Sequence, residues 1–392
     1  MSGRSRVALV SLVTLLVVGI ALGLGSAGRP GPSSPPPSGA ESSVTVTPSV
    51  SGSAAATQAS ATPPGPSSEA PSGPVVTWTR LPKTGVAPTA RQGATWTVDP
   101  STGIAYLYGG TTSPTLGRPL EDGATLGDLW AYDLAADSWE PVVGTSDEPP
   151  PRSGHVAVWV EDVGLVVIGG RASDGQPLGD VWRFDPESGA WSQLALRGTQ
   201  PPPRFDACAA APGDGTIWLT HGTNGRSLFG TTWRLDLASK RWTEIARSER
   251  PITRSRTSCW VDAGGRFVVS GGDRGGATLG DLWAISVGRA DADWTKLAGG
   301  GTFSPRGGAA AAIHLDEAVV FGGLGSDRAA RSDLGALGPT EGTITPVPAD
   351  GPTPPARAGA VLVDDPAGER MLLYGGATAD GVSADLWSAD LR

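Results

Sequence analysis

Residues 151–191 read PRSGHVAVWVEDVGLVVIGGRASDGQPLGDVWRFDPESGAW, and the same pattern returns along most of the chain. The pattern opens with a Pro-Arg pair at Arg152 and reaches a glycine pair at Gly169-Gly170. It continues to an Asp-x-Trp strand at residues 180–182 and ends on a second tryptophan, Trp191. The pattern repeats with a period of about 50 residues, and a fixed period of this length indicates a repeat architecture.

The leading arginines set the register of six copies. They lie 61, 52, 50, 52 and 51 positions apart along the chain. The six residues are Arg91, Arg152, Arg204, Arg254, Arg306 and Arg357. The third copy has His221-Gly222 in place of the glycine pair, and the fifth has Gly335 and Ile344 in place of its two tryptophans. We therefore expect the fifth copy to be the least regular.

Each copy holds four short runs rich in Val, Leu, Ile, Trp and Tyr, separated by Gly, Pro and Asp. Short strands at this spacing predict an antiparallel meander. The glycine pairs suit a positive φ or a close backbone approach at a strand end. The tryptophans suit the gaps between twisted sheets, because they bury much area with few rotamers. These features predict an all-β protein whose aromatic residues are mostly structural.

These residues resemble the kelch repeat: an arginine-led strand, a strand ending in Gly-Gly, an Asp-x-Trp strand and an outer strand with tryptophan. The resemblance covers residues 75–392. It implies a propeller of the galactose oxidase and kelch type, with six four-stranded antiparallel blades packed around a channel.

The two ends of the repeat region predict how the ring closes. The sixth copy stops at Arg392 after three strands and lacks the outer tryptophan strand. A strand of that kind stands before the first copy, at residues 77–81 with Trp78. We predict that this segment completes the last blade, because pairing the chain start with the chain end removes an exposed sheet edge.

The N-terminal residues predict export. Arg4 and Arg6 precede an uncharged stretch whose apolar part, residues 7–24, would be about 27 Å long as a helix. Residues 1–28 are therefore a cleaved signal peptide or an uncleaved transmembrane anchor, and the length favours the anchor. The region has no cysteine, which excludes a lipoprotein anchor. The positive flank places the rest of the chain outside the cytoplasm, membrane-anchored or secreted.

Residues 29–74 consist almost entirely of Pro, Ser, Thr, Ala and Gly. Such a segment cannot bury enough apolar surface to offset the entropy of ordering, so we predict a disordered linker. Residues 75–392 form the predicted propeller. The preference for Arg over Lys and the abundance of Gly, Ala and Pro are typical of a GC-rich bacterial genome.

The composition of the chain argues against nucleic-acid binding and against metal or nucleophile chemistry. The net charge of −9 and the pI near 4.9 argue against nucleic acid as a partner, because that binding depends on neutralising phosphates. Three histidines and two cysteines leave little material for a metal site or a nucleophile, so we expect neither metal nor cofactor. Cys208 and Cys259 lie on neighbouring predicted inner strands with opposite parity, which in an exported protein favours a disulfide over two buried thiols.

The six arginines are the first candidate binding residues, because repeat symmetry places them together near one mouth of the channel. In one interpretation they bind a carboxylate, phosphate or sulfate bidentately. In kelch adaptors of cullin ubiquitin ligases, arginines at comparable positions contact acidic peptides, so the resemblance supports this interpretation. In the other, each arginine bonds loop carbonyls or a neighbouring acid and sets the blade spacing.

The face that carries the arginines has further candidates. The first copy has about eight extra residues between Thr111 and Gly127, including Arg118, Glu121 and Asp122. Elaborated loops on one end of a fold often serve contact, although surface loops also drift freely. His155, Asp206 and His221 lie near the arginines in the repeat and could bind a ligand or transfer a proton.

Three functions remain open. The first is a binding module without enzymatic activity, displayed at the cell envelope, that engages a protein or an anionic glycan. The second is a metal-free sugar enzyme resembling the mutarotases of this family, which needs only one acid or base. Copper chemistry is excluded, because the four tyrosines sit at regular strand positions and no histidine pair has ligand spacing. The third is an envelope scaffold, which an exposed apolar patch would favour. The oligomeric state stays open.

Overall fold

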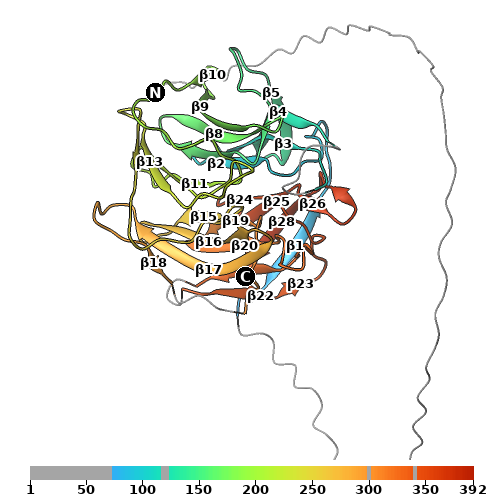
Figure 1. The fold of residues 1–392 in the computed structure, drawn as a ribbon. Coiled ribbons are helices and arrows are strands. Elements are labelled where there is room, and N and C mark those ends of the chain that lie inside the picture. The colour runs from blue at the N-terminus through green and yellow to red at the C-terminus, as the bar shows by residue number, and fades with distance from the viewer. Residues whose placement is uncertain (1–72, 116–122, 298–301, 339–341) are drawn as a thin grey trace, which may run out of the picture. The chain divides into compact units, whose positions relative to one another are not determined.

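The computed structural model describes residues 73–115, 123–297, 302–338 and 342–392, and these residues form six β-sheets arranged as blades around a centre (Figure 1). Blade one contains β2 (Thr95–Asp99), β3 (Ile104–Thr111), β4 (Thr125–Asp133) and β5 (Ser138–Val142). Blade two contains β6 (Arg152–Ser153), β7 (Val156–Val160), β8 (Gly164–Ala172), β9 (Pro177–Asp185) and β10 (Ala190–Gln193). Blade three contains β11 (Cys208–Ala210), β12 (Thr216–Thr220), β13 (Thr232–Asp236) and β14 (Arg241–Glu244).

The second half continues the order. Blade four contains β15 (Ser258–Val261), β16 (Arg266–Arg274), β17 (Ala277–Ser286) and β18 (Thr295–Lys296). Blade five contains β19 (Ala310–His314), β20 (Glu317–Phe321), β21 (Leu334–Leu337) and β22 (Ile344–Val347). Blade six contains β24 (Val361–Asp365), β25 (Arg370–Tyr374), β28 (Leu386–Leu391), β1 (Val76–Leu81) and β23 (Ala349–Asp350). A hairpin of β26 (Ala377–Thr378) and β27 (Gly381–Val382) extends from blade six.

The predicted six-bladed all-β fold is confirmed. Within each blade the neighbouring strands of the meander pair antiparallel. In Figure 1 the first strands β2, β11, β15, β19 and β24 lie near the centre, whereas β10, β18 and β22 lie at the edge. No helix long and apolar enough to cross a membrane occurs among the residues that the structure describes. The predicted N-terminal helix and nearly all of the linker lie outside those residues.

The predicted closure of the ring is also confirmed. β1 pairs antiparallel with β28 from Val76 opposite Leu391 to Leu81 opposite Leu386. Val75 and Arg392 extend the pairing, because each backbone N–H donates to the carbonyl of the other at 2.7 and 3.0 Å. The start and the end of the described chain therefore share one sheet.

The hydrophobic core is divided into six clusters, one in each gap between neighbouring blades. The gap between blades six and one holds Trp96, Trp139 and Tyr374, with ring centroids 5.3 to 6.3 Å apart. Each cluster joins two blades that could not bury these faces alone. The tryptophans thus have the structural role that the repeat predicts.

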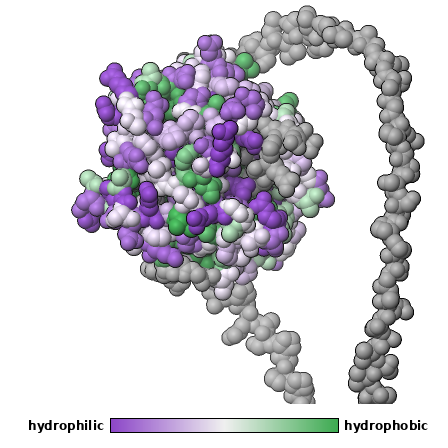
Figure 2. All heavy atoms as spheres, viewed as in Figure 1, coloured by the Kyte–Doolittle hydropathy of each residue, from purple (hydrophilic) through white to green (hydrophobic). Residues whose placement is uncertain are grey.

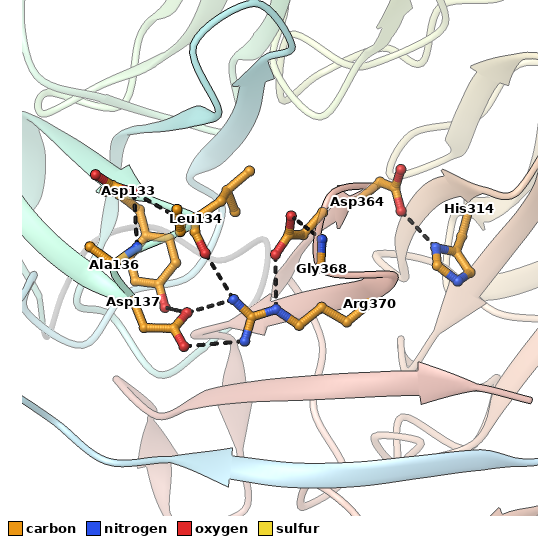
Figure 3. A network of polar contacts seen from close by, with 11 residues as sticks. Asp133, Leu134, Ala136, Asp137, His314, Asp364, Gly368 and Arg370 are labelled. Atoms are coloured by element: carbon orange, nitrogen blue, oxygen red, sulfur yellow. Dashed lines mark hydrogen bonds and ion pairs between the residues drawn. The ribbon is translucent and has the colours of Figure 1, made fainter.

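Polar contacts reinforce the same closure (Figure 3). Arg370, the first residue of β25 in blade six, donates to both carboxylate oxygens of Asp137 and to the carbonyl of Leu134 in blade one, at 2.6 to 3.2 Å. It also binds Asp365 at 2.9 Å. His314 of blade five and Asp364 of blade six lie 2.6 Å apart through Nδ1 and Oδ1.

Blade five is more regular than its sequence predicts. Its four strands pair without interruption, and Ile344 is buried. A Cβ on Gly335 would meet the ring of Phe303 at 2.6 Å, so this phenylalanine, from the preceding connection, fills the space of the missing tryptophan.

The structure joins Cys208 of β11 and Cys259 of β15 in a disulfide, with their Cα atoms 6.0 Å apart. The bond links the inner strands of blades three and four and closes a sequence separation of 51 residues.

We predict that Trp78→Ala will destabilise the propeller by about 3–5 kcal/mol, as large-to-small changes of buried aromatics do. Trp78 is 3% exposed and its ring packs 5.0 Å from Phe321 of blade five, so the change opens the gap where the ring closes. Urea unfolding of the full chain measures the effect. Thr79→Ala, at the next and exposed position of β1, should change the free energy of unfolding by less than about 0.5 kcal/mol. Equal effects of the two substitutions would contradict the closure as an energetic lock.

Candidate functional site

The arginine of each blade is buried inside the blade, as blade two illustrates. Arg152 is fully buried and its Nε donates to the carbonyl of Pro150 at 3.1 Å. Its Nη1 donates to the carbonyl of Gly169 at 2.8 Å and to Asp180 Oδ1 at 2.8 Å, and its Nη2 donates to Asp180 Oδ2 at 2.9 Å. Trp182 Nε1 donates to the same carboxylate at 2.7 Å. We call this set of contacts the arginine relay.

Four other blades repeat the arginine–aspartate part of the relay, and three of them also have the tryptophan. The ion pairs are Arg91–Asp128, Arg254–Asp281, Arg306–Asp333 and Arg357–Asp385, at 2.5 to 2.7 Å. In blade two, burial alone would raise the pKa of Asp180, but the hydrogen bonds and charge of Arg152 hold it below its usual value. Four of the five N–H donors of Arg152 are already used within the blade. For these five arginines the geometry favours the spacing role over the binding role.

Arg204 of blade three departs from the relay. Thr231 stands where the other blades have aspartate, and Arg204 Nη2 reaches its Oγ1 at 3.3 Å. The guanidinium lies over the ring of Phe229, 4.4 Å from its centroid. Arg204 is 3% exposed, and this burial lowers its pKa to about 10.

A closed belt of backbone hydrogen bonds surrounds the centre, two residues after each arginine. The six N–H···O=C bonds run from blade to blade at 2.7 to 3.0 Å, and each residue has a φ between 51° and 68°. The belt residues are Gly93, Gly154, Asp206, Arg256, Gly308 and Gly359. A positive φ favours glycine, so Asp206 and Arg256 hold strained backbone positions. Backbone strain of this kind is concentrated at functional sites, so Asp206 and Arg256 are candidate functional residues.

Charged side chains from blades two to five gather beside the belt, and we call Arg171, Asp206, Arg256, Asp273 and Arg328 the mouth cluster. Asp273 accepts hydrogen bonds from Arg256 at 2.7 Å and from Arg328 at 3.1 Å. Arg171 lies over the ring of Phe205, 5.3 Å from its centroid. Burial raises the pKa of Asp206, and the charges of Arg256 and Arg171 oppose that rise. Three arginines and two aspartates give the cluster a formal charge of +1 in a chain of −9.

A hollow of about 620 Å³ adjoins the cluster and shares Arg328 with it. Its other walls are largely small and apolar, including Leu324, Ala330, Ala358 and Ala377 from blades five and six. A volume of several hundred Å³ is typical of ligand pockets. Arginine and alanine together suit an apolar group next to an anionic one.

The structure separates the other candidate residues. Asp206 lies in the mouth cluster, half-buried. His155 is buried and its Nε2 lies 2.8 Å from Thr95 Oγ1. His221 is fully buried at a φ of 57°. Burial lowers the pKa of each histidine to about 3, so both are neutral near pH 7. Arg118, Glu121 and Asp122 lie outside the described residues.

Sequence reasoning missed four residues of the mouth cluster: Arg171, Arg256, Asp273 and Arg328. A signal existed for three of them. The belt position is glycine in four copies and charged in two, and the residue after the glycine pair is charged only in copies two and four. Arg328 lies in a loop of irregular sequence and carried no repeat signal. Among the described residues, no group of three or more His, Cys, Asp or Glu side chains could hold a metal ion.

We predict that Asp180→Asn will destabilise the chain by about 3 kcal/mol at pH 7, because it leaves the buried charge of Arg152 without its carboxylate. The folded-state pKa of Asp180 is lowered, so its stabilisation is present above the unfolded pKa of about 4 and is lost as the pH falls through the folded value. The difference between wild type and variant should therefore shrink below about pH 4. Urea unfolding at several pH values tests this, with Glu187→Gln on an exposed turn as the control. A difference that stays constant with pH would contradict the relay.

Comparisons with known proteins agree with the geometry. The family model described as the KLHDC2/KLHL20/DRC7 Kelch-repeats domain matches residues 75–272. Serine/threonine-protein phosphatase BSL2 of Arabidopsis thaliana is 33% identical over 214 residues, covering 52% of this chain and 19% of that protein. Multiple epidermal growth factor-like domains protein 8 of Homo sapiens is 32% identical over 215 residues, covering 50% and 8%. The chain thus spans less than a fifth of the length of these relatives. A solved structure titled "Structure of YjhT" has a TM-score of 0.60 at 16% identity and covers 78% of this chain and 98% of that one, which shows a shared fold alone.

Proposed function

This chain belongs to the kelch-repeat family, whose propellers typically mediate protein interactions, and on that premise we propose that it is a binding module without enzymatic activity. Its ligand is a protein segment that carries an anionic group beside small apolar side chains. The binding surface is the end of the propeller that carries the mouth cluster and the alanine-lined hollow.

The observation that carries the proposal is the sharing of Arg328 between the mouth cluster and the hollow. The Arg328 side chain is 49% exposed although it pairs with Asp273. Its guanidinium can therefore meet an incoming carboxylate while the hollow accepts an apolar group. Arg256 and Arg171 add positive charge nearby, which steers anionic partners toward the mouth.

The outer surface favours this role over that of an apolar scaffold. Among the described residues, the large hydrophobic side chains that are exposed are Val86, Val143, Ile252 and Leu315, and they are far apart in the sequence. Figure 2 shows mostly hydrophilic side chains on the face in view, with hydrophobic ones in small separate areas. Scattered exposed apolar residues need no partner to cover them.

We place the binding module outside the cytoplasm, attached through residues 1–28 or released after their cleavage. The charge flank and apolar length of these residues support the placement. The described chain enters blade six beside Arg392, at the end of β28 that lies away from Asp385 and its relay. The first described residues thus enter the propeller away from the start of the inner strands.

We predict that Arg328→Gly will weaken capture of the partner by about tenfold, the loss expected from one charge-assisted contact. Arg328 has a φ of 63° and Arg256 a φ of 54°, so glycine relieves backbone strain at both sites. Arg256→Gly is the second variant. Because each substitution is tested singly, the other arginine still binds Asp273. The measurement is crosslinking capture from intact cell envelopes with the full chain, quantified for the same partner protein across variants.

Arg266→Ala is the matched control, because Arg266 pairs with Asp262 in the β15–β16 turn at the other end of the inner strands. It should capture the partner as wild type does. If Arg328→Gly and Arg256→Gly capture as much partner as the control, the mouth cluster is not the binding site. Recovery of only sugars would instead point to a small-molecule site.

We predict that an anchored chain will sediment with the membranes, that protease added to intact cells or spheroplasts will degrade its propeller, and that a cleaved chain will be released from the cells. Mass spectrometry of the purified chain distinguishes the two forms. A mass that includes the N-terminus would identify the anchor, whereas a mass lacking about the first 27 residues would identify a cleaved signal peptide. A protease-resistant propeller in the soluble cytoplasmic fraction would contradict the proposed location.

A further inference from the structure

Five blades of this chain show what the arginine relay requires. A buried guanidinium binds both oxygens of an aspartate, and in four of these blades a tryptophan two residues later donates its indole N–H to the same carboxylate at 2.6 to 2.9 Å. The carboxylates are not sealed from solvent, because the aspartate side chains are 9% to 43% exposed. The outer side of the carboxylate position therefore faces solvent, whereas the guanidinium behind it is buried.

Blade three keeps both donors of the relay but has no carboxylate between them. Arg204 Nε and Nη1 bind the carbonyls of Pro202 and His221 at 3.0 and 2.9 Å, as in the other blades. Thr231 replaces the aspartate and offers Nη2 one hydroxyl at 3.3 Å. Trp233 stands where the other tryptophans donate, and its buried Nε1 has no hydrogen-bond partner in the described part of the chain.

The charge of Arg204 is therefore poorly compensated. The one carboxylate that raises the Arg204 pKa is Glu244 of β14, which is exposed, and no hydrogen bond between the two occurs among the described residues. Phe229 covers the face of the guanidinium but a cation–π contact leaves the N–H edge available. A buried cation without a carboxylate partner and a buried indole N–H without an acceptor both favour an added anion.

We propose that blade three binds a carboxylate from outside the propeller, which completes the relay between Arg204 and Trp233. The ligand carboxylate takes one hydrogen bond from each, beside Thr231. Its source is a free organic acid or the side chain of an acidic residue in a docked protein. The site shares no residue with the mouth cluster, so it does not depend on the proposed function.

The Trp233 indole N–H provides a direct test in the full chain. ¹H–¹⁵N spectra resolve the indole signals, and Trp233→Phe and Trp182→Phe assign two of them. Titration with acetate at constant pH and ionic strength should shift the Trp233 signal and leave the Trp182 signal in place, because Asp180 already holds Trp182. Thr231→Asp should raise the midpoint of thermal unfolding by about 2–6 °C and abolish the acetate shift.

A capped tripeptide, acetyl-Ala-Asp-Ala-amide, distinguishes the two sources. If the Trp233 indole signal shifts at a lower concentration of peptide than of acetate, the natural ligand is a protein side chain. If both probes act at equal concentrations, the ligand is a free carboxylate. Absence of a Trp233 shift with both probes overturns the proposal. A Trp233 shift that persists in Thr231→Asp also overturns it, because the anion then binds elsewhere.

Asp180→Thr creates the composition of blade three in blade two and is the reciprocal control. Acetate should then shift the Trp182 signal and restore part of the lost thermal stability. If Asp180→Thr responds to acetate and wild-type Trp233 does not, the relay chemistry is right but the proposed site in blade three is wrong. If Asp180→Thr does not fold, wild type and Thr231→Asp decide the question between them.

Discussion

A buried guanidinium group ties three strands together at one end of each regular blade. In blade two it joins the start of the first strand, the glycine pair that ends the second and the aspartate at the third. Burying a charge is costly, and here four charge-assisted hydrogen bonds offset the cost. Because loss of one partner would leave the other uncompensated, the pair constrains the sequence of the whole repeat.

Because of this constraint, the charged side chains available for binding occupy positions next to the relay arginines. Five of the six repeated arginines bind an aspartate of their own blade, so few of their N–H donors remain for a ligand. Charge available at the channel mouth comes instead from the belt and from the turns after the glycine pairs. Asp206 and Arg256 occupy belt positions where four other blades have glycine. Their backbone strain is tolerated because six interblade hydrogen bonds fix the belt.

Blade three differs from the five other copies of the repeat around its buried arginine. Thr231, His221 and Phe229 all differ from their counterparts, and all contact or adjoin Arg204. A single substitution could be drift. Here the arginine and the tryptophan of the relay are kept while the aspartate acceptor is replaced, and the five other copies in the same chain show what that aspartate binds. The two donors thus point to an acceptor supplied from outside.

The sequence by itself determined the number of blades, their strand order and the closure by Trp78, because these follow from a local pattern repeated at a fixed period. It also predicted that tryptophans fill the gaps between blades. It could not decide between the structural and the binding role of the arginines, since Arg152 meets Asp180 across 28 positions only after the blade folds. Nor could it show that Phe303 replaces the tryptophan missing at Gly335, or that Arg370 reaches Asp137 across 233 positions. A repeat specifies which strands form, whereas burial, charge pairing and exposure depend on contacts between segments far apart in the chain, which only the tertiary structure brings together.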